Sequence, residues 1–313
     1  MTPNIKKTLW ALTIYFSLSF FMLGVSAMMH YFIYPTFDKV HENISNFMDV
    51  FNNRIIFLFY IPSVLLLLSS ISLFWFAPKN FSKWIIWISI VLSAISVMTI
   101  FFVLVPIQNS FSSTNGFEKI QCDDLLSKSL TFQLIPIVLQ VLLAFGLLNT
   151  FIKNESLFAK WVFIIVFSLA FFTAGSDFTE KILNYPLWLK VSTSEWMEFR
   201  QIVHTNAFLW IYLLPAFLPL LLIILMFWFK PKPIKRKFIF IYFGLYLFIS
   251  VISSVYFVPK LQIQLNKAYS IKLIEELIKM DFPLRFLPSL LIYALAVFMF
   301  IKVGQNQLQE TKQ

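Results

Sequence analysis

The chain has 313 residues, of which 59% are hydrophobic, 19% are aromatic and 13% are charged, with a mean hydropathy of +0.79. A soluble domain usually carries about 25% charged residues, so this composition excludes an ordinary water-soluble protein. The formal net charge of +10 does not predict a nucleic-acid partner, because the basic residues gather in short segments between apolar blocks. Cys122 is the single cysteine, which excludes an intrachain disulfide and a cysteine-based metal cluster.

Long apolar blocks predict an all-α integral membrane protein with eight transmembrane helices, whose first partner is the lipid bilayer. Each block has about 20 residues, enough to cross a hydrocarbon core of about 30 Å at 1.5 Å per residue. The blocks do not alternate between apolar and polar residues, which argues against a β-barrel. The first block resembles a signal peptide, but the same segment recurs in mid-chain, so we expect it to be retained. In chain order the predicted spans are 8–33, 54–77, 84–106, 131–152, 161–180, 205–229, 238–258 and 285–302.

The distribution of charge predicts the orientation. The two ends of the chain and alternate connections hold 13 of the 25 basic residues but only two of the 15 acids, Glu155 and Glu310. Short basic segments beside span ends face the cytoplasm, so we expect both termini there and the four longer connections outside. Residue usage rich in Phe, Ile, Lys and Asn is typical of AT-rich bacterial genomes, which indicates a bacterial cytoplasmic membrane. The 13 basic residues are Lys6, Lys7, Lys79, Lys83, Lys153, Lys160, Lys230, Lys232, Lys235, Arg236, Lys237, Lys302 and Lys312.

Ordered matches of Gly, Trp and Pro predict that residues 1–153 and 154–313 are two copies of one four-helix membrane repeat. Four spans are an even number, so both copies enter the membrane from the same side, and a pseudo-twofold axis along the membrane normal should relate them. The matches are Phe21 and Gly24 with Phe172 and Gly175, Tyr34-Pro35 with Tyr185-Pro186, Pro62 with Pro215, Phe74-Trp75-Phe76 with Phe227-Trp228-Phe229, Val105-Pro106 with Val258-Pro259, and Pro136 with Pro288.

Two of the outer connections are predicted to be partly helical. Ser192-Thr193-Ser194-Glu195 fits a capping box that opens a short helix. Apolar residues recur at helical spacing over 271–279, with charges between them, which predicts an amphipathic helix lying at the outer interface.

The two copies differ in their charged residues, which marks candidate site positions. Ser26, Met29 and His30 correspond to Asp177, Glu180 and Lys181, Phe51 corresponds to His204, and Gln133 corresponds to Arg285. Ionisable groups at the edge of a membrane span are functional candidates, because leaving them in lipid is costly. The candidate ligand-binding residues are therefore Asp177, Glu180, Lys181, His204 and Arg285.

Each candidate also has a structural interpretation. Asp177, Glu180 and Lys181 share a helix face and can form an interfacial salt bridge that ends the helix. His204 suits a ligand or an acid–base role near neutral pH, but a lone histidine at a helix end is more often hydrogen-bonded in a structural role. Arg285 can extend its charge to the interface or hold an anionic group. No HxxxH or HExxH spacing joins the three histidines, so no metal site is predicted and no cofactor is assigned.

The motif residues resemble a family of small, uncharacterised four-span bacterial membrane proteins with a YP…H…P…VPxH pattern and an arginine opening the fourth span. The first copy matches at Tyr34-Pro35, Pro62 and Val105-Pro106, and the second at Tyr185-Pro186, Pro215 and Val258-Pro259. The resemblance implies that His204 and Arg285 are the retained family positions. Gln108 and Leu261 stand where the family has a histidine after Val-Pro, so a histidine-ligated cofactor site would be incomplete.

Three classes of function remain open. The preferred hypothesis is a polytopic membrane protein that binds a small molecule or a lipid in an outward-facing pocket of the second repeat. A membrane-embedded, oxidoreductase-like enzyme would need His204 and Arg285 to converge with Asp177 and Glu180. A transporter would need polar residues deep in the spans, where Gln140 and Asn149 are the main examples besides serines, and a structural or assembly partner would need only apolar packing and exposed loops.

Overall fold

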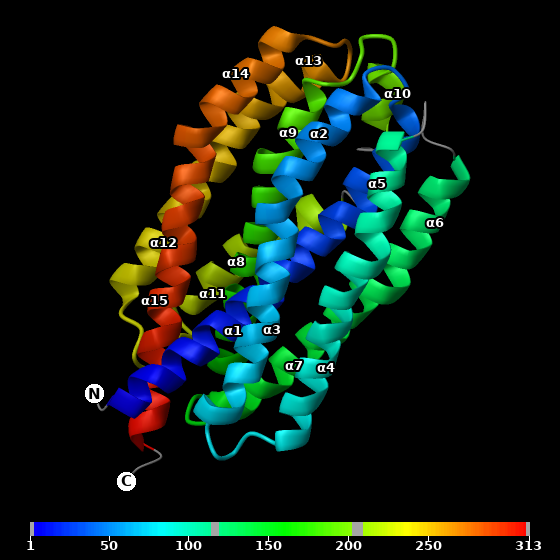
Figure 1. Cartoon of the computed structure of the whole chain (residues 1–313). Coiled ribbons are helices and arrows are strands. Elements are labelled where there is room, and N and C mark those ends of the chain that lie inside the picture. The colour runs from blue at the N-terminus through cyan, green and yellow to red at the C-terminus, as the bar shows by residue number, and fades with distance from the viewer. Residues whose placement is uncertain (1–2, 114–118, 202–208, 311–313) are drawn as a thin grey trace.

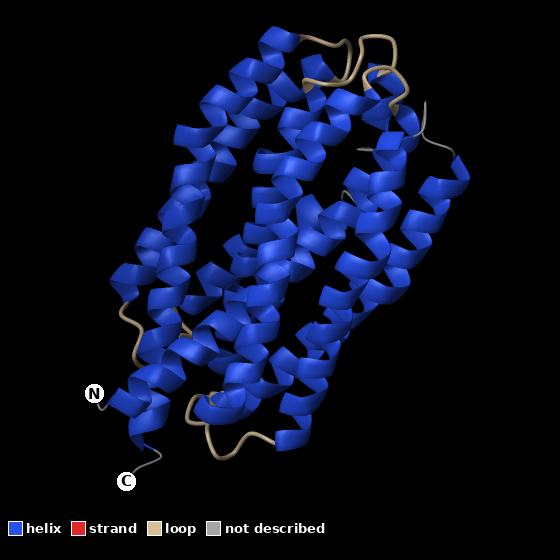
Figure 2. Cartoon of the chain, viewed as in Figure 1, coloured by secondary structure: helices blue, strands red, loops and turns tan. Residues whose placement is uncertain are grey.

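The computed structural model describes residues 3–113, 119–201 and 209–310, and these ranges form a bundle of long helices without a strand (Figures 1 and 2). The predicted fold class is confirmed, because eight helices are long and apolar enough to cross a membrane. They are Pro3–Lys39, Ile44–Phe76, Lys83–Phe111, Lys119–Phe151, Leu157–Trp188, Leu209–Met226, Arg236–Leu265 and Ile271–Gln309.

Most of these helices are longer than the spans predicted from hydropathy. Leu157–Trp188 has 32 residues, or about 48 Å of helix against a hydrocarbon core of about 30 Å. Hydropathy detects only the apolar part of such a helix, so the predicted outer connections contain much additional helix. The segment 271–279 is helical as predicted, and it forms the first part of the single long helix Ile271–Gln309 instead of a separate helix.

The elements of the first half are α1 (Pro3–Met28), a 3-10 helix (Tyr34–Lys39), α2 (Ile44–Ile55), α3 (Ile61–Phe76), α4 (Lys83–Thr99), α5 (Val105–Ser113), α6 (Lys119–Ser129) and α7 (Ile135–Phe151). Those of the second half are α8 (Leu157–Phe178), α9 (Tyr185–Trp188), α10 (Trp196–Gln201), α11 (Leu214–Met226), α12 (Arg236–Ile252), α13 (Ile263–Leu265), α14 (Ile271–Asp281) and α15 (Leu287–Glu310). The predicted boundary after residue 153 lies in the connection between α7 and α8.

A π-helical segment, here called a π turn, interrupts every one of the eight spans. In seven spans a proline lies two positions after the last residue of the π turn, and in the remaining one Pro259 lies inside it. These eight prolines are the ones that the sequence pairs between the halves. The π turns are Met29–Ile33, Ile56–Tyr60, Ile100–Leu104, Leu130–Leu134, Thr179–Asn184, Leu209–Leu213, Ser253–Gln262 and Phe282–Phe286.

The hydrogen bonds explain why the π turns precede proline. A proline inside an α-helix lacks an N–H, and its ring collides with the carbonyl group four residues earlier. In this protein the residue before the proline donates its N–H to the carbonyl five residues back, as Tyr34 does to Met29 and Tyr185 does to Glu180. The wider π turn relieves the collision and lets the helix continue, which suits a membrane, where unpaired backbone groups are costly.

The first helix of each half lies at the centre of the bundle. The α1 helix packs against α3 and α7 of its own half, and α8 packs in the same way against α11 and α15. The third span of each half, α4 or α12, contacts the second and fourth spans of that half, and α1 and α8 pack along each other between the halves (Figure 1). The contacts within one half thus match those within the other.

Both ends of the described chain lie at the same end of the bundle (Figure 1). The connections between α3 and α4, α7 and α8, and α11 and α12 lie at that end as well (Figure 2). The basic segments of the sequence are therefore collected at one end, and the more acidic connections at the opposite end.

Candidate functional site

Two helices of the second half carry facing rows of polar side chains. On α8 and the residues that follow it, Thr173, Asp177, Lys181 and Tyr185 recur at a spacing of four, and this spacing places side chains on one helix face. The facing row runs from α14 into α15 at the same spacing. Its members are Asp281, Arg285, Ser289 and Tyr293.

Asp281 is the centre of the ion pairs between the two rows. Its side chain is only 3% exposed. Arg285 Nε and Nη2 both donate to Asp281 Oδ1, and Lys181 Nζ lies 3.3 Å from Oδ2. Arg285 Nη2 also donates to the Tyr185 hydroxyl at 2.8 Å, and its guanidinium lies over the ring of Phe257 at 3.9 Å from the centroid. Both charges of this pair are thus held by several partners, as buried ions require.

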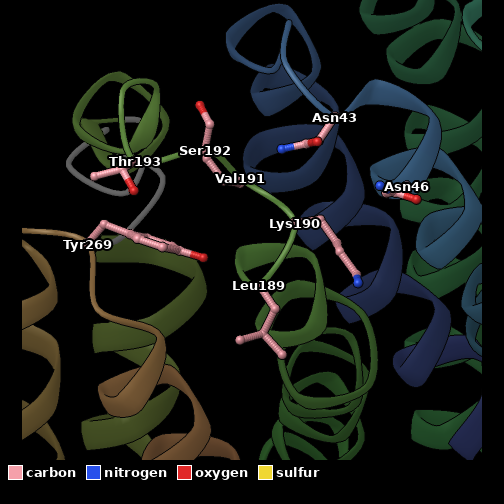
Figure 3. A pocket seen from close by; sticks show the side chains of 8 residues that line it. All are labelled: Asn43, Asn46, Leu189, Lys190, Val191, Ser192, Thr193 and Tyr269. Atoms are coloured by element: carbon pink, nitrogen blue, oxygen red, sulfur yellow. The ribbon is translucent and has the colours of Figure 1, made fainter.

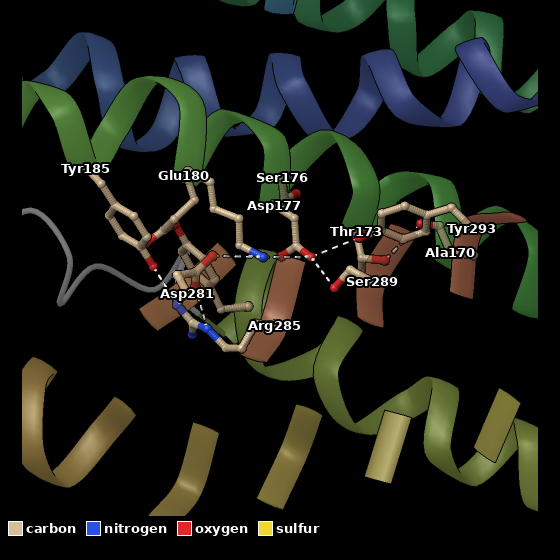
Figure 4. Close-up of polar contacts among 12 residues, drawn as sticks. Ala170, Thr173, Ser176, Asp177, Glu180, Tyr185, Asp281, Arg285, Ser289 and Tyr293 are labelled. Atoms are coloured by element: carbon tan, nitrogen blue, oxygen red, sulfur yellow. Dashed lines mark hydrogen bonds and ion pairs between the residues drawn. The ribbon is translucent and has the colours of Figure 1, made fainter. Parts of the chain in front are cut away.

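Asp177 lies further toward the middle of the membrane and is more accessible. Its Oδ2 accepts hydrogen bonds from Tyr293 at 2.8 Å and Ser289 at 3.3 Å, and Lys181 Nζ lies 3.8 Å away (Figure 4). The side chain of Asp177 is nevertheless 38% exposed. Asp177 follows Lys160 by 17 residues, about 26 Å of helix, which is close to the thickness of a hydrocarbon core of about 30 Å, so the two residues belong near opposite boundaries of such a core.

Glu180 extends the site toward a second arginine. Its carboxylate accepts a hydrogen bond from Tyr212, on the π turn that precedes α11. Arg200 on α10 donates to Asn266 and Gln262 and lies 4.5 Å from the ring centroid of Trp188. Burial lowers the pKa of the Arg200 guanidinium from its ordinary value, and the nearby Glu180 carboxylate opposes that shift.

The corresponding positions of the first half form a neutral network. Gln133, which corresponds to Arg285, donates to the Ser26 hydroxyl at 3.1 Å and accepts a hydrogen bond from Ser129 at 3.3 Å. Ser26 and Ser129 stand where the second half has Asp177 and Asp281. The two halves thus place polar groups at the same level of the fold, but only the second half makes them ionic.

A second neutral cluster lies deeper in the first half. The Tyr15 and Ser89 hydroxyls are 2.7 Å apart, and Gln140 Nε2 donates to both, at 3.1 Å and 2.7 Å. All three side chains are buried, and Gln140 Oε1 has no partner among the described residues. Asn149, the other amide singled out in the sequence, does not belong to this cluster.

The structure brings together four of the five predicted site residues, Asp177, Glu180, Lys181 and Arg285. His204 lies outside the described residues. Sequence comparison of the halves did not select Asp281, although its spacing of four from Arg285 was visible and could have identified it. Tyr212 and Tyr293 come from other spans, and no sequence signal connects them to Glu180 or Asp177.

Two cavities lie away from this network. A polar cavity of about 270 Å³ opens between the halves at the end of the bundle opposite to the termini, and Figure 3 shows Asn43 and Asn46 on one side of it and Thr193 and Tyr269 on the other. An apolar groove of about 400 Å³, lined by Ile56, Tyr60, Ile61, Val64, Leu65 and Phe101, lies on the first half. The residues of the network line neither cavity.

In the described ranges, no group of three His, Cys, Asp or Glu side chains is placed to hold a metal ion. Comparison of the chain with models of protein families, with curated proteins and with solved structures finds no match. The site therefore has to be interpreted from its own geometry.

Proposed function

We propose that this polytopic membrane protein binds a small polar molecule or a lipid headgroup at the outer end of its second half. The observation that carries the proposal is the ion network of Asp177, Lys181, Asp281 and Arg285, which leaves Asp177 exposed. Charged groups at this depth are costly unless they are paired or used. The first half builds the same framework with neutral residues, so the fold itself does not require the charges.

The location of the network supports an outward-facing site. Its charges lie near the end of the bundle opposite to the basic connections. Under the positive-inside rule those basic connections and both termini face the cytoplasm, so the network opens toward the outside of a bacterial cytoplasmic membrane. The polar cavity beside Lys190 and Tyr269 lies at the same end of the bundle.

The duplication belongs to the same proposal. The matched contacts of the two halves support an origin from one four-helix unit, of which one copy now carries neutral side chains and the other charged ones. Two of the residues that carry the resemblance to small four-span bacterial membrane proteins, Tyr185 and Tyr34, make polar contacts at equivalent positions of the halves. The Tyr185 hydroxyl accepts a hydrogen bond from Arg285 in the second half. The Tyr34 hydroxyl accepts one from Gln108 at 3.1 Å in the first half.

The test is ligand binding by the purified protein in lipid nanodiscs. A panel of small amines, carboxylates and phosphates, together with lipids of different headgroups, would be screened by the shift in unfolding temperature. We expect at least one class to stabilise the protein, and Asp177→Asn together with Arg285→Gln to remove the effect. The control is Gln133→Ala in the first half, which should leave ligand stabilisation unchanged. If no ligand class acts through the network, its role is structural.

A transporter is the second candidate, favoured by the deep polar groups. They include Tyr15, Ser89 and Gln140 in the first half and Tyr293 in the second. Flux of the ligand into proteoliposomes, compared with binding alone, separates transport from binding. The enzyme hypothesis depends on His204, and Arg285 already directs two of its nitrogens to Asp281 and Tyr185.

A further inference from the structure

The charges of the network are not evenly matched. The two carboxylate oxygens of Asp281 form ion pairs with Arg285 and Lys181. The Lys181 ammonium group is 3.8 Å from the Asp177 carboxylate. Glu180 contacts a tyrosine hydroxyl. Arg200, the third base in the neighbourhood, is directed to the side chains of Asn266 and Gln262. Asp177 is therefore the carboxylate of the network that combines a single distant basic partner with a side chain that is 38% exposed.

The carboxylate of Asp177 is oriented while one side of it stays open. Tyr293 and Ser289 both donate to Oδ2, and the contact with Lys181 also goes to Oδ2. Two hydroxyl groups from α15 therefore fix the plane of the carboxylate. The side chain as a whole is 38% exposed, and these contacts all go to Oδ2, which leaves the carboxylate room for a further hydrogen-bond donor.

Aromatic rings lie beside this part of the network. Phe178 packs edge-on against Phe286 with centroids 5.0 Å apart and lies near Tyr293 at 6.5 Å. The ammonium group of Lys181 lies 5.2 Å from the centroid of Phe286. The faces of aromatic rings attract cations, and a carboxylate beside such rings is the usual combination for recognising an ammonium group. The protein already holds one ammonium group, its own Lys181, in this manner.

We infer that Asp177 binds the ammonium group of an amine ligand, with Tyr293 and Ser289 orienting its carboxylate. This inference rests on the proposed function and names its ligand class. The amine can belong to a free small molecule or to the ethanolamine headgroup of a phospholipid in the outer leaflet. Ser26 occupies the corresponding position of the first half and carries no charge. The proposed ammonium site therefore belongs to the second half.

The experiment uses the full-length protein in nanodiscs of pure phosphatidylglycerol. Ethanolamine and methylammonium are the amine probes, and acetate and inorganic phosphate are the anion probes. Amine binding should raise the unfolding temperature in a saturable manner. Asp177→Asn should weaken it by more than about tenfold, equivalent to about 1.4 kcal/mol. A separate arm replaces part of the phosphatidylglycerol by phosphatidylethanolamine, and competition with free ethanolamine then identifies a lipid source.

The chain supplies a matched control in Asp124→Asn. Asp124 and Lys128 form an ion pair at the same i,i+4 spacing as Asp177 and Lys181, but on the exposed helix α6. This variant should bind amines as the unmodified protein does. Asp177→Glu keeps the negative charge and should retain measurable binding, which separates loss of charge from loss of folding.

The outcomes distinguish this inference from the proposed function. If acetate or phosphate binds in a manner that Arg285→Gln abolishes, while amines do not bind, the amine assignment is wrong and the proposed function stands. If amines bind equally well to Asp177→Asn, the assignment is likewise wrong. If no probe or lipid acts through the network, both proposals fail.

Discussion

Gly24 of α1 and Gly175 of α8 make the same contact from opposite sides. A Cβ atom on Gly24 would overlap the backbone carbonyl oxygen of Phe172, and a Cβ atom on Gly175 would overlap that of Phe21. The two helices therefore approach until backbone touches backbone, as small residues permit between helices in a membrane. Gly24 contacts Phe172 and Gly175 contacts Phe21, and these are equivalent positions of the two halves. The contact is therefore reciprocal, as at the interface of a symmetric dimer.

Replacing either glycine by alanine should therefore separate the halves. We expect Gly24→Ala and Gly175→Ala each to lower the free energy of unfolding by about 1–3 kcal/mol, the usual cost of overpacking. Unfolding in mixed micelles with increasing SDS measures the change. Gly146→Ala and Gly244→Ala are the controls, because a Cβ at either position meets nothing within 4 Å. They should leave stability unchanged or raise it by up to about 1 kcal/mol through helix propensity; equal losses at all four positions would contradict a specific contact.

Removal of Asp281 should destabilise the second half strongly. Asp281→Ala leaves the charges of Lys181 and Arg285 without their shared partner, and breaking a buried ion pair costs about 3–5 kcal/mol. Asp124→Asn is the comparison, because its pair with Lys128 is exposed and surface pairs of this kind contribute about 0.3–0.5 kcal/mol. SDS unfolding of both variants gives the difference, and a loss below 1 kcal/mol for Asp281→Ala would show that the network is solvated.

Tyr185 and Tyr34 allow the charged and neutral networks to be compared at equivalent positions. Tyr185→Phe removes the hydroxyl that accepts from the Arg285 guanidinium, and Tyr34→Phe removes the one that accepts from the Gln108 amide. Hydrogen bonds to charged groups contribute about 1.5–3 kcal/mol and neutral ones about 0.5–1.5 kcal/mol. We therefore expect the larger loss of stability for Tyr185→Phe. A larger loss for Tyr34→Phe would indicate that the ion pair with Asp281 is sufficient to hold Arg285 without the Tyr185 hydroxyl.

The orientation can be tested by cysteine labelling in intact cells. In a Cys122→Ser background, Lys119→Cys and Lys267→Cys should react with a membrane-impermeant maleimide. Lys79→Cys and Lys232→Cys lie at the opposite, basic end and should react only after the cells are opened. All four positions are exposed, so failure to label reports sidedness and not burial. The opposite labelling pattern would show that the orientation is inverted and that the ion network lies on the cytoplasmic side.

Hydropathy was sufficient to predict eight membrane helices, because crossing a hydrocarbon core requires an uninterrupted apolar length. It did not locate the ends of the helices. The outer parts, such as α14, are amphipathic, and they are helical because Ile274 and Leu277 are buried against the rest of the protein. The predicted capping box is found only in part: Ser192 and Glu195 bond to each other, but Glu195 Oε1 accepts from the backbone N–H groups of His41 and Glu42, and α10 begins only at Trp196.

The sequence by itself determined the apolar spans, the collection of positive charge on alternate connections, and the eight paired prolines. Each of these can be identified from residue types and their spacing along the chain. The tertiary structure decided how the prolines are accommodated, how closely α1 and α8 approach, and which charges meet. Asp177 and Tyr293 are 116 positions apart, and only the packing of α15 against α8 brings the hydroxyl to the carboxylate. An ion network depends on distances of a few ångströms between separate helices, and local sequence patterns do not contain those distances.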